Sequence, residues 1–208
     1  MYKESRDVMS ESAKPEVVDG RRARSERSKQ ALIDASLALV QEGNLIPTAQ
    51  QISDRAGVGI RSFFRHFEDM EALFATMERQ TRESSVALFL GGDREGTLEE
   101  RILHAIERYG IAYEKERNLI LSTSALLWRS EILRKNYARN QRALRRDLDD
   151  WLPELKQLTG SERVVVDAIA SFEMWHRLRY HQGLSEQASI DVIVGLLSSQ
   201  LKDGTRFQ

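Results

Sequence analysis

Two arginines, Arg61 and Arg65, follow a short glycine-rich segment at residues 57–59. A guanidinium group holds its N–H donors in a rigid fork that can pair bidentately with O6 and N7 of guanine in a DNA major groove. Phe63 lies between the two arginines and Phe67 follows one helical turn later, so the aromatic and cationic side chains fall on different sides of a helix. The spacing predicts a short helix that is anchored by its aromatic side and reads nucleobases with its cationic side.

Other residues near this segment are suited to phosphate contacts. Thr48 follows Pro47 and is expected to cap a helix, where its hydroxyl and the free backbone N–H groups of the first turn can face a phosphate. His66 is assigned either a DNA contact or a packing role within the His66-Phe67 pair, with about equal weight. The residues that we predict to contact DNA are Arg22, Arg24, Thr48, Ile60, Arg61, Ser62, Phe64, Arg65 and His66.

Charge is distributed unevenly along the chain. The whole chain has 31 basic and 32 acidic residues and a net charge of −1. Residues 21–66 are locally basic, with Arg21, Arg22, Arg24, Arg27, Lys29, Arg55, Arg61 and Arg65 against Glu26, Asp34, Glu42 and Asp54. This pattern is typical of a small DNA-binding module joined to an acidic partner domain, although a solvated helix face gives a similar pattern.

The elements that would position these side chains are short helices. Apolar residues recur at helical spacing from residue 24 to residue 42, where Gly43 ends the helix. A second helix is expected from Thr48 to Gly57, and a third from Ile60 to His66. Two short helices joined by a glycine-containing turn, with Val58 filling the crevice between them, form a helix-turn-helix.

The run from Thr48 to Leu73 resembles the signature of TetR-family transcriptional regulators, because the Ala56-Gly57-Val58 turn, the His66-Phe67 pair and the following Glu71 and Leu73 all fall in register. The resemblance implies an all-α homodimer that binds a palindromic operator in double-stranded DNA. It also implies a variable C-terminal domain that binds a small-molecule effector and contributes two helices per subunit to the dimer interface.

The sequence departs from this family pattern at two positions. Phe64 stands where a tyrosine is usual, and Met70 stands where a lysine is usual, so two phosphate-contacting groups are missing. Either Arg65, His66 and an N-terminal arm carry more of the backbone contact, or the affinity for DNA is low. This arm consists of Arg21, Arg22, Arg24 and Arg27.

The remainder of the chain reads as helical to its end. Few Gly and Pro residues and a helical apolar period predict an all-α fold of about nine helices, among them separate helices at 97–117, 118–128, 130–152, 161–182 and 185–201. We divide the chain into a disordered tail (residues 1–20), a three-helix helix-turn-helix DNA-binding domain (residues 21–68) and a helical effector-binding and dimerisation domain (residues 69–208).

Aromatic and apolar residues of the C-terminal domain supply candidates for the effector pocket and the dimer interface. The pocket candidates are His104, Tyr109, Tyr113, Trp128, Phe172 and Trp175, although aromatic residues at helical spacing are more often plain core. Arg129, Arg177 and Arg179 hint at an anionic or polar effector. The interface candidates are Val165, Ile169, Phe172, Ile190, Val194, Leu197 and Leu201, from helices with more apolar surface than one inward stripe needs.

Several classes of protein are set aside by the sequence. With no cysteine, a disulfide scaffold or a thiolate site is excluded, and a reducing cytoplasm is the expected compartment. We expect no transmembrane span, no metal site, no cofactor and no enzyme activity, because no catalytic motif or metal-ligand spacing is present. The favoured function is a sequence-specific transcriptional regulator, most simply a ligand-responsive repressor. The alternative is a helical small-molecule-binding or protein-interaction module whose DNA-binding head is weakened.

Overall fold

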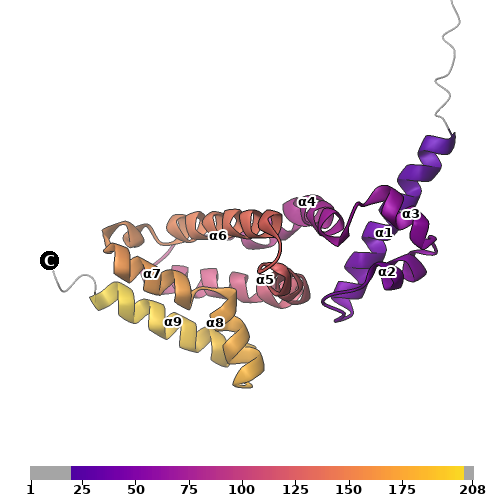
Figure 1. The fold of residues 1–208 in the computed structure, drawn as a ribbon. Coiled ribbons are helices and arrows are strands. Elements are labelled where there is room, and N and C mark those ends of the chain that lie inside the picture. The colour runs from indigo at the N-terminus through magenta and orange to yellow at the C-terminus, as the bar shows by residue number, and fades with distance from the viewer. Residues whose placement is uncertain (1–19, 204–208) are drawn as a thin grey trace, which may run out of the picture.

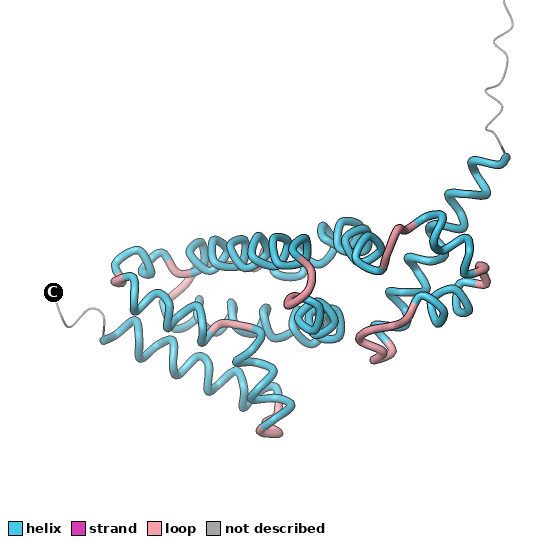
Figure 2. The backbone as a smooth tube through the Cα atoms, viewed as in Figure 1, coloured by secondary structure: helices cyan, strands magenta, loops and turns pink. Residues whose placement is uncertain are grey.

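The computed structural model describes residues 20–203, and these residues are helical with short connections (Figures 1 and 2). The all-α prediction is confirmed for this part of the chain, which contains nine α-helices and no strand. The helices are α1 (Gly20–Gln41), α2 (Ala49–Ala56), α3 (Ile60–His66), α4 (Met70–Phe89), α5 (Leu98–Leu126), α6 (Glu131–Trp151), α7 (Gly160–Ile169), α8 (Phe172–His176) and α9 (Glu186–Asp203). A 3₁₀ turn, η1 (Pro153–Gln157), follows α6, and a π-helical turn, η2 (Arg177–His181), continues α8.

The expected number of helices is met although three of the expected helices differ. The helices expected at 97–117 and 118–128 are one continuous helix, α5, because no proline or helix stop separates them. The helix expected at 161–182 is broken at Ala170, where the Ser171 side chain accepts a hydrogen bond from the Met174 N–H and starts α8. The predicted tail at residues 1–20 lies outside the described residues except for Gly20, which begins α1.

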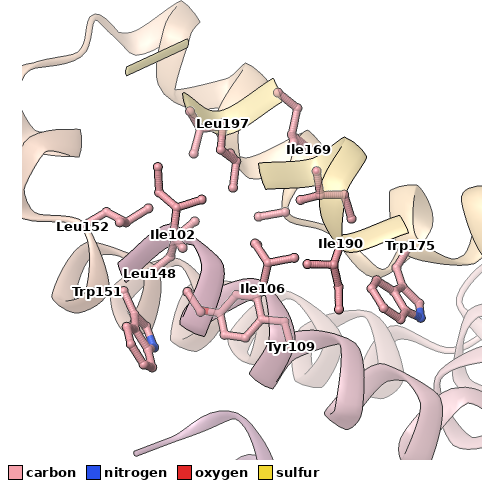
Figure 3. Packing of buried hydrophobic residues seen from close by; sticks show 14 of the residues in the cluster. Ile102, Ile106, Tyr109, Leu148, Trp151, Leu152, Ile169, Trp175, Ile190 and Leu197 are labelled. Atoms are coloured by element: carbon pink, nitrogen blue, oxygen red, sulfur yellow. The ribbon is translucent and has the colours of Figure 1, made fainter. Parts of the chain in front are cut away.

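Two buried hydrophobic clusters organise the chain. The larger one lies in the C-terminal part, where α5 packs against α6, α8 and α9, and α7 packs on α8 and α9. Figure 3 shows side chains of this cluster that come from α5, α6, α7, α8 and α9. The smaller one, here called the head cluster, contains the buried apolar residues of α1 to α3 and the first half of α4, together with Leu126 of α5 and Leu133 of α6. The head cluster therefore crosses the boundary that we drew at residue 68, and the two parts of the chain share a core.

One close helix contact depends on a glycine inside α5. A Cβ atom added to Gly110 would lie 2.5 Å from the Trp175 ring, which is closer than real contacts allow. Trp175 is buried, and its Nε1 donates to Glu114 at 3.1 Å. Gly110 thus costs some helix propensity but lets α8 approach α5.

Within residues 20–203, every helix is too short or too polar to span a lipid bilayer.

Candidate nucleic-acid interface

The turn between α2 and α3 has the geometry expected of a helix-turn-helix. Thr48 and Gln51 form a capping box at the start of α2, with the Gln51 N–H donating to Thr48 Oγ1 at 3.2 Å and the Thr48 N–H donating to Gln51 Oε1 at 2.9 Å. Gly57 ends the helix with φ of 63°, a left-handed conformation that favours glycine. Val58 is half-buried against the head cluster, as the sequence predicts. These contacts fix the direction in which α3 leaves the turn.

Helix α3 is anchored on one side and open on the other. Phe63 is fully buried, Phe67 is 3% exposed, and their ring centroids lie 5.8 Å apart in the head cluster. On the opposite side, Arg61 is exposed and makes no hydrogen bond or ion pair with any other described residue. Phe64 is 56% exposed. The structure therefore presents an unengaged guanidinium and an exposed ring on the outer side of α3.

The other candidates on α3 are less free. Arg65 is exposed, and its Nη2 donates to Ser62 Oγ at 3.4 Å. Ile60 is half-buried and packs against the head cluster, so part of its side chain supports the helix. The capping box also engages the Thr48 hydroxyl, which donates to Gln51 Oε1 at 3.2 Å. A phosphate at this position would have to share the hydroxyl of Thr48 with the cap.

His66 lies between the two roles that the sequence left open, and the structure favours packing. Its Nε2 atom is enclosed in the protein and has no hydrogen-bond partner among the described residues. Burial lowers the pKa of His66 below its usual value, and the neighbouring charges of Arg65 and Lys29 lower it further. A neutral ring packed against α1 is the state that this environment stabilises.

The start of α1 projects away from the rest of the head (Figure 1). It begins four residues before the expected position, because good helix formers continue the helix without an inward apolar side chain. Arg22 and Arg24 are exposed there, and neither guanidinium contacts another side chain within residues 20–203. The head thus carries a second cationic surface, separate from α3.

Polar contacts brace the head internally and against the C-terminal part. Arg55 of α2 pairs with Glu42 at 2.6 Å, and Gln30 and Gln80 exchange hydrogen bonds between α1 and α4. The buried Ser130 hydroxyl, at the start of α6, donates to Glu71 Oε1 at 2.6 Å at the start of α4. These contacts tie the position of the head to α4 and α6.

A cavity of about 140 Å³ lies between α4, α5 and α6, next to the head cluster. Phe74, Met77, Leu126 and Leu133 line it, and all four belong to the head cluster. Its far end is lined by residues of the larger cluster, among them Phe89, Tyr113 and Phe172. The cavity therefore lies between the two cores. We call it the inner chamber.

Two of the six predicted pocket residues, Tyr113 and Phe172, line this chamber. The prediction is wrong for Trp128, which is 79% exposed at the turn after α5, and for His104, which is exposed on α5. Trp175 is buried against Gly110 instead, and Tyr109 lines only a neighbouring cavity. The periodicity placed these residues on helices correctly, but it could not tell which helix would cover them.

The arginines that hinted at an anionic effector do not line the chamber. Arg129 and Arg177 are exposed, and Arg179 pairs with Glu114 at 2.7 Å. Glu114 also accepts from Trp175 and from the Tyr180 hydroxyl; burial acts to raise its pKa, but these hydrogen bonds outweigh burial and lower it. Arg179 therefore closes a structural network.

Sequence reasoning missed a buried carboxylate in the chamber wall. Asp147 of α6 is 3% exposed, accepts from the Tyr109 hydroxyl at 2.9 Å and pairs with Arg94 at 2.6 Å. Burial raises the pKa of Asp147 in spite of these partners, and burial together with Asp147 raises the pKa of Tyr109. Arg94 comes from the connection between α4 and α5, so no helical period in the sequence could have linked it to Asp147.

The predicted dimer residues need a correction. Ile169, Phe172, Ile190, Leu197 and Leu201 are buried in the larger cluster of their own chain and are not available to a partner. Val194 is half-buried, and Val165 is exposed. The outward apolar residues of α7 and α9 are Val164, Val165, Val192 and Leu196, so the exposed stripe lies beside the predicted one.

No group of three or more His, Asp or Glu side chains within residues 20–203 is arranged to hold a metal ion.

Comparison with known proteins places this arrangement in context. Residues 32–77, from α1 into α4, match the model of the family described as bacterial regulatory proteins, tetR family. No curated protein matches the chain. A tetR-family transcriptional regulator from Streptomyces coelicolor is similar in structure, with a TM-score of 0.69 and 15% identity over 88% of this chain and 84% of that chain.

Two further solved structures share the fold. A transcriptional regulator from Rhodococcus sp. Rha1 has a TM-score of 0.63 and 16% identity, over 86% of this chain and 96% of that chain. The multidrug binding protein EbrR, in a complex with imidazole, has a TM-score of 0.56 and 17% identity, over 83% of this chain and 94% of that chain.

Proposed function

We propose that this chain, whose residues 32–77 match the model of the tetR family of bacterial regulatory proteins, is a sequence-specific transcriptional regulator that acts as a homodimer and releases its operator when a small molecule binds. The family comprises regulatory proteins, which agrees with a role other than catalysis. A protein that binds its operator only without the small molecule acts most simply as a repressor of transcription.

The observation that carries the proposal is the mounting of α3. Phe63 and Phe67 fix its inner side in the head cluster, while Arg61 stands outside without a partner among the described residues. The anchored helix holds the backbone of Arg61 in place, and no existing ion pair has to break when its guanidinium pairs with a guanine.

Ligand response is supported by the position of the inner chamber. A molecule in the chamber would touch Phe74 and Met77 of α4 directly, and both side chains also pack in the head cluster. A ligand that fits the chamber better in one position of α4 than in another shifts the head toward that position, and DNA binding changes reciprocally.

A homodimer is supported by the outward stripe of α7 and α9. Val164 of α7 is 63% exposed and Leu196 of α9 is 41% exposed, and the two helices pack against each other. Operator recognition by the proposed dimer requires a twofold axis that places both copies of α3 on one side, where a separation of roughly 34–36 Å fits successive major grooves.

The proposal is tested by selecting duplexes from a random-sequence pool with the purified full chain, and then measuring affinity for the selected duplex by fluorescence anisotropy. Arg61→Ala should weaken this affinity by about 1–3 kcal/mol and should lose discrimination at one base pair of each half-site. Arg146→Ala, which removes an exposed and unpaired arginine of α6, is the charge-matched control and should bind as the wild type does.

Failure to enrich any duplex at low salt would instead favour the alternative, a helical binding module with a weakened head. The exposed ring of Phe64, in place of a hydroxyl-bearing side chain, is the feature that favours this alternative.

A further inference from the structure

A second cavity adjoins the inner chamber. It has a volume of about 200 Å³, is lined by residues of α5, α6 and α7, and is here called the outer chamber. Tyr113, Gln141 and Leu144 line both chambers, so the same three side chains form the wall between them. Among these, Gln141 and Leu144 are half-buried side chains of α6.

Size argues that the two chambers act together. Pockets for small organic ligands usually start at about 300 Å³. The inner chamber, at about 140 Å³, has the size of a cavity that accepts a single benzene ring, and the outer chamber, at about 200 Å³, is also below the usual range. Their joint volume exceeds this threshold.

The two chambers differ in charge. In the inner chamber, Glu78 is neutralised by Arg82 at 2.8 Å and Arg139 at 2.9 Å, and Asp147 is neutralised by Arg94. Glu116 accepts from the Ser85 hydroxyl at 2.8 Å at the edge formed by α4 and α5. Apolar side chains such as Val86, Ile120 and Leu144 fill most of the remaining wall.

The outer chamber has a cation in surplus. Asp167 pairs with both Arg163, at 2.9 Å, and Arg145, at 3.3 Å, and Arg163 also pairs with Asp149. Arg142 lines the same chamber and has no hydrogen bond or ion pair with any described residue. Its guanidinium is therefore available to an anionic group.

We propose that the two chambers form one site for an amphipathic organic anion, whose apolar body, of about one ring, occupies the inner chamber and whose carboxylate or similar group pairs with Arg142. The ligand passes the wall at Gln141 and Leu144, whose side chains turn aside. This inference rests on the proposed ligand response and adds to it the class of ligand and the residue that selects it.

The test uses calorimetry on the full chain without DNA, so that it does not depend on operator binding. The probes are phenylbutyrate, phenylbutanol and phenylbutylamine, which share one skeleton and differ in the charge of the head group. Phenylbutyrate should bind more tightly than the other two. Arg142 is exposed, so Arg142→Ala should weaken phenylbutyrate by about twofold to fivefold, the usual effect of losing a solvent-screened ion pair, and should leave phenylbutanol unchanged.

Three further variants sharpen the result. Arg142→Lys keeps the charge and should retain part of the affinity, while Arg146→Ala should bind phenylbutyrate as the wild type does. Leu144→Trp places a larger side chain in the shared wall and should weaken the binding of phenylbutyrate. Thermal unfolding of this variant shows whether its fold is intact. Equal affinity of wild type and Arg142→Ala for phenylbutyrate, tighter binding of phenylbutylamine, or no binding of phenylbutyrate at millimolar concentration would each overturn the proposal, whether or not the chain binds DNA.

Discussion

The side chains of the head have two roles: some anchor helices in the core, and others extend into solvent. Phe63 and Phe67 hold α3 in the head cluster, whereas Arg61, Arg22 and Arg24 extend into solvent. The periodicity of the sequence was sufficient to predict which of these side chains are buried and which are exposed. Apolar and charged residues alternate along the short helix α3, so only one of its sides can face the core. It was not sufficient for His66, whose surroundings come from α1 and from its neighbour Arg65.

Arg22 on the projecting start of α1 is expected to contact the DNA backbone and not the bases. Replacing Arg22 by Ala should lower affinity evenly for all duplex sequences and should reduce the slope of log K against log salt by about one. The measurement is anisotropy at several salt concentrations, with a selected and a scrambled duplex. A loss confined to the selected duplex would show that Arg22 reads bases.

His66 should make the head less stable in mild acid. Its pKa is lower in the folded state than the ordinary 6.5, so folding disfavours the protonated ring. The contribution of His66 to stability is complete above about pH 6.5 and is lost as the pH falls through the folded pKa. Urea unfolding of the wild type at about pH 7.5 and about pH 5 should therefore show a larger loss of stability than His66→Gln shows over the same interval. The pKa of His176 is also lowered, so some dependence should remain in the variant. A steeper dependence of stability on pH in His66→Gln than in the wild type would contradict this account.

At the scale of helices, the sequence predicts the helix starts better than it predicts where the long helices end. Thr48 with Gln51 and Thr97 with Glu100 cap α2 and α5 as their spacing suggests. The sequence lacked a comparable signal for the break at Ala170, where only Ser171 marks a new start. The continuity of α5 was missed because a strongly apolar stretch after residue 118 suggested a separate buried helix.

Gly110 tests whether α8 must approach α5 closely. Replacing it by Ala improves helix propensity by about 1 kcal/mol, but the new methyl group would lie within 2.5 Å of the Trp175 ring. We expect a net loss of stability of about 1–3 kcal/mol from overpacking, measured by denaturant unfolding. Gly20→Ala, at the exposed first residue of α1 with open space around the new methyl group, is the control and should be neutral or stabilising. Equal stability gains in both variants would mean that Trp175 can move aside freely.

At the scale of the whole molecule, self-association is expected to depend on the outward stripe of α7 and α9. Val164→Glu together with Leu196→Glu should convert the dimer to a monomer in sedimentation experiments, because paired carboxylates would be buried across the twofold axis. Operator affinity should fall by orders of magnitude, since each half-site would be bound alone. Ile132→Glu adds charge at another exposed apolar position and should leave the dimer intact. Dimers that persist in the double variant would locate the interface elsewhere.

The architecture was predicted better than its cavities were. A helix-turn-helix follows from local turn chemistry at Gly57 and Val58, which are neighbours in sequence. The chambers depend on α4, α5, α6 and α7 meeting across distances of up to about a hundred residues, and side chains such as Arg142 and Asp147 acquire their roles only there. Trp128 is likewise exposed because no helix within residues 20–203 packs over it, and this too depends on the tertiary arrangement.

Leu126 and Leu133 complete the interior of the head from the far side of the chain. A fragment that stops at residue 68 would leave a hole where these leucines and α4 belong, and it should be poorly folded and prone to stick to other proteins. The DNA-binding head therefore cannot be transferred by itself to another protein. A chimera would need two apolar side chains of matching size in the recipient domain to fill the positions of Leu126 and Leu133.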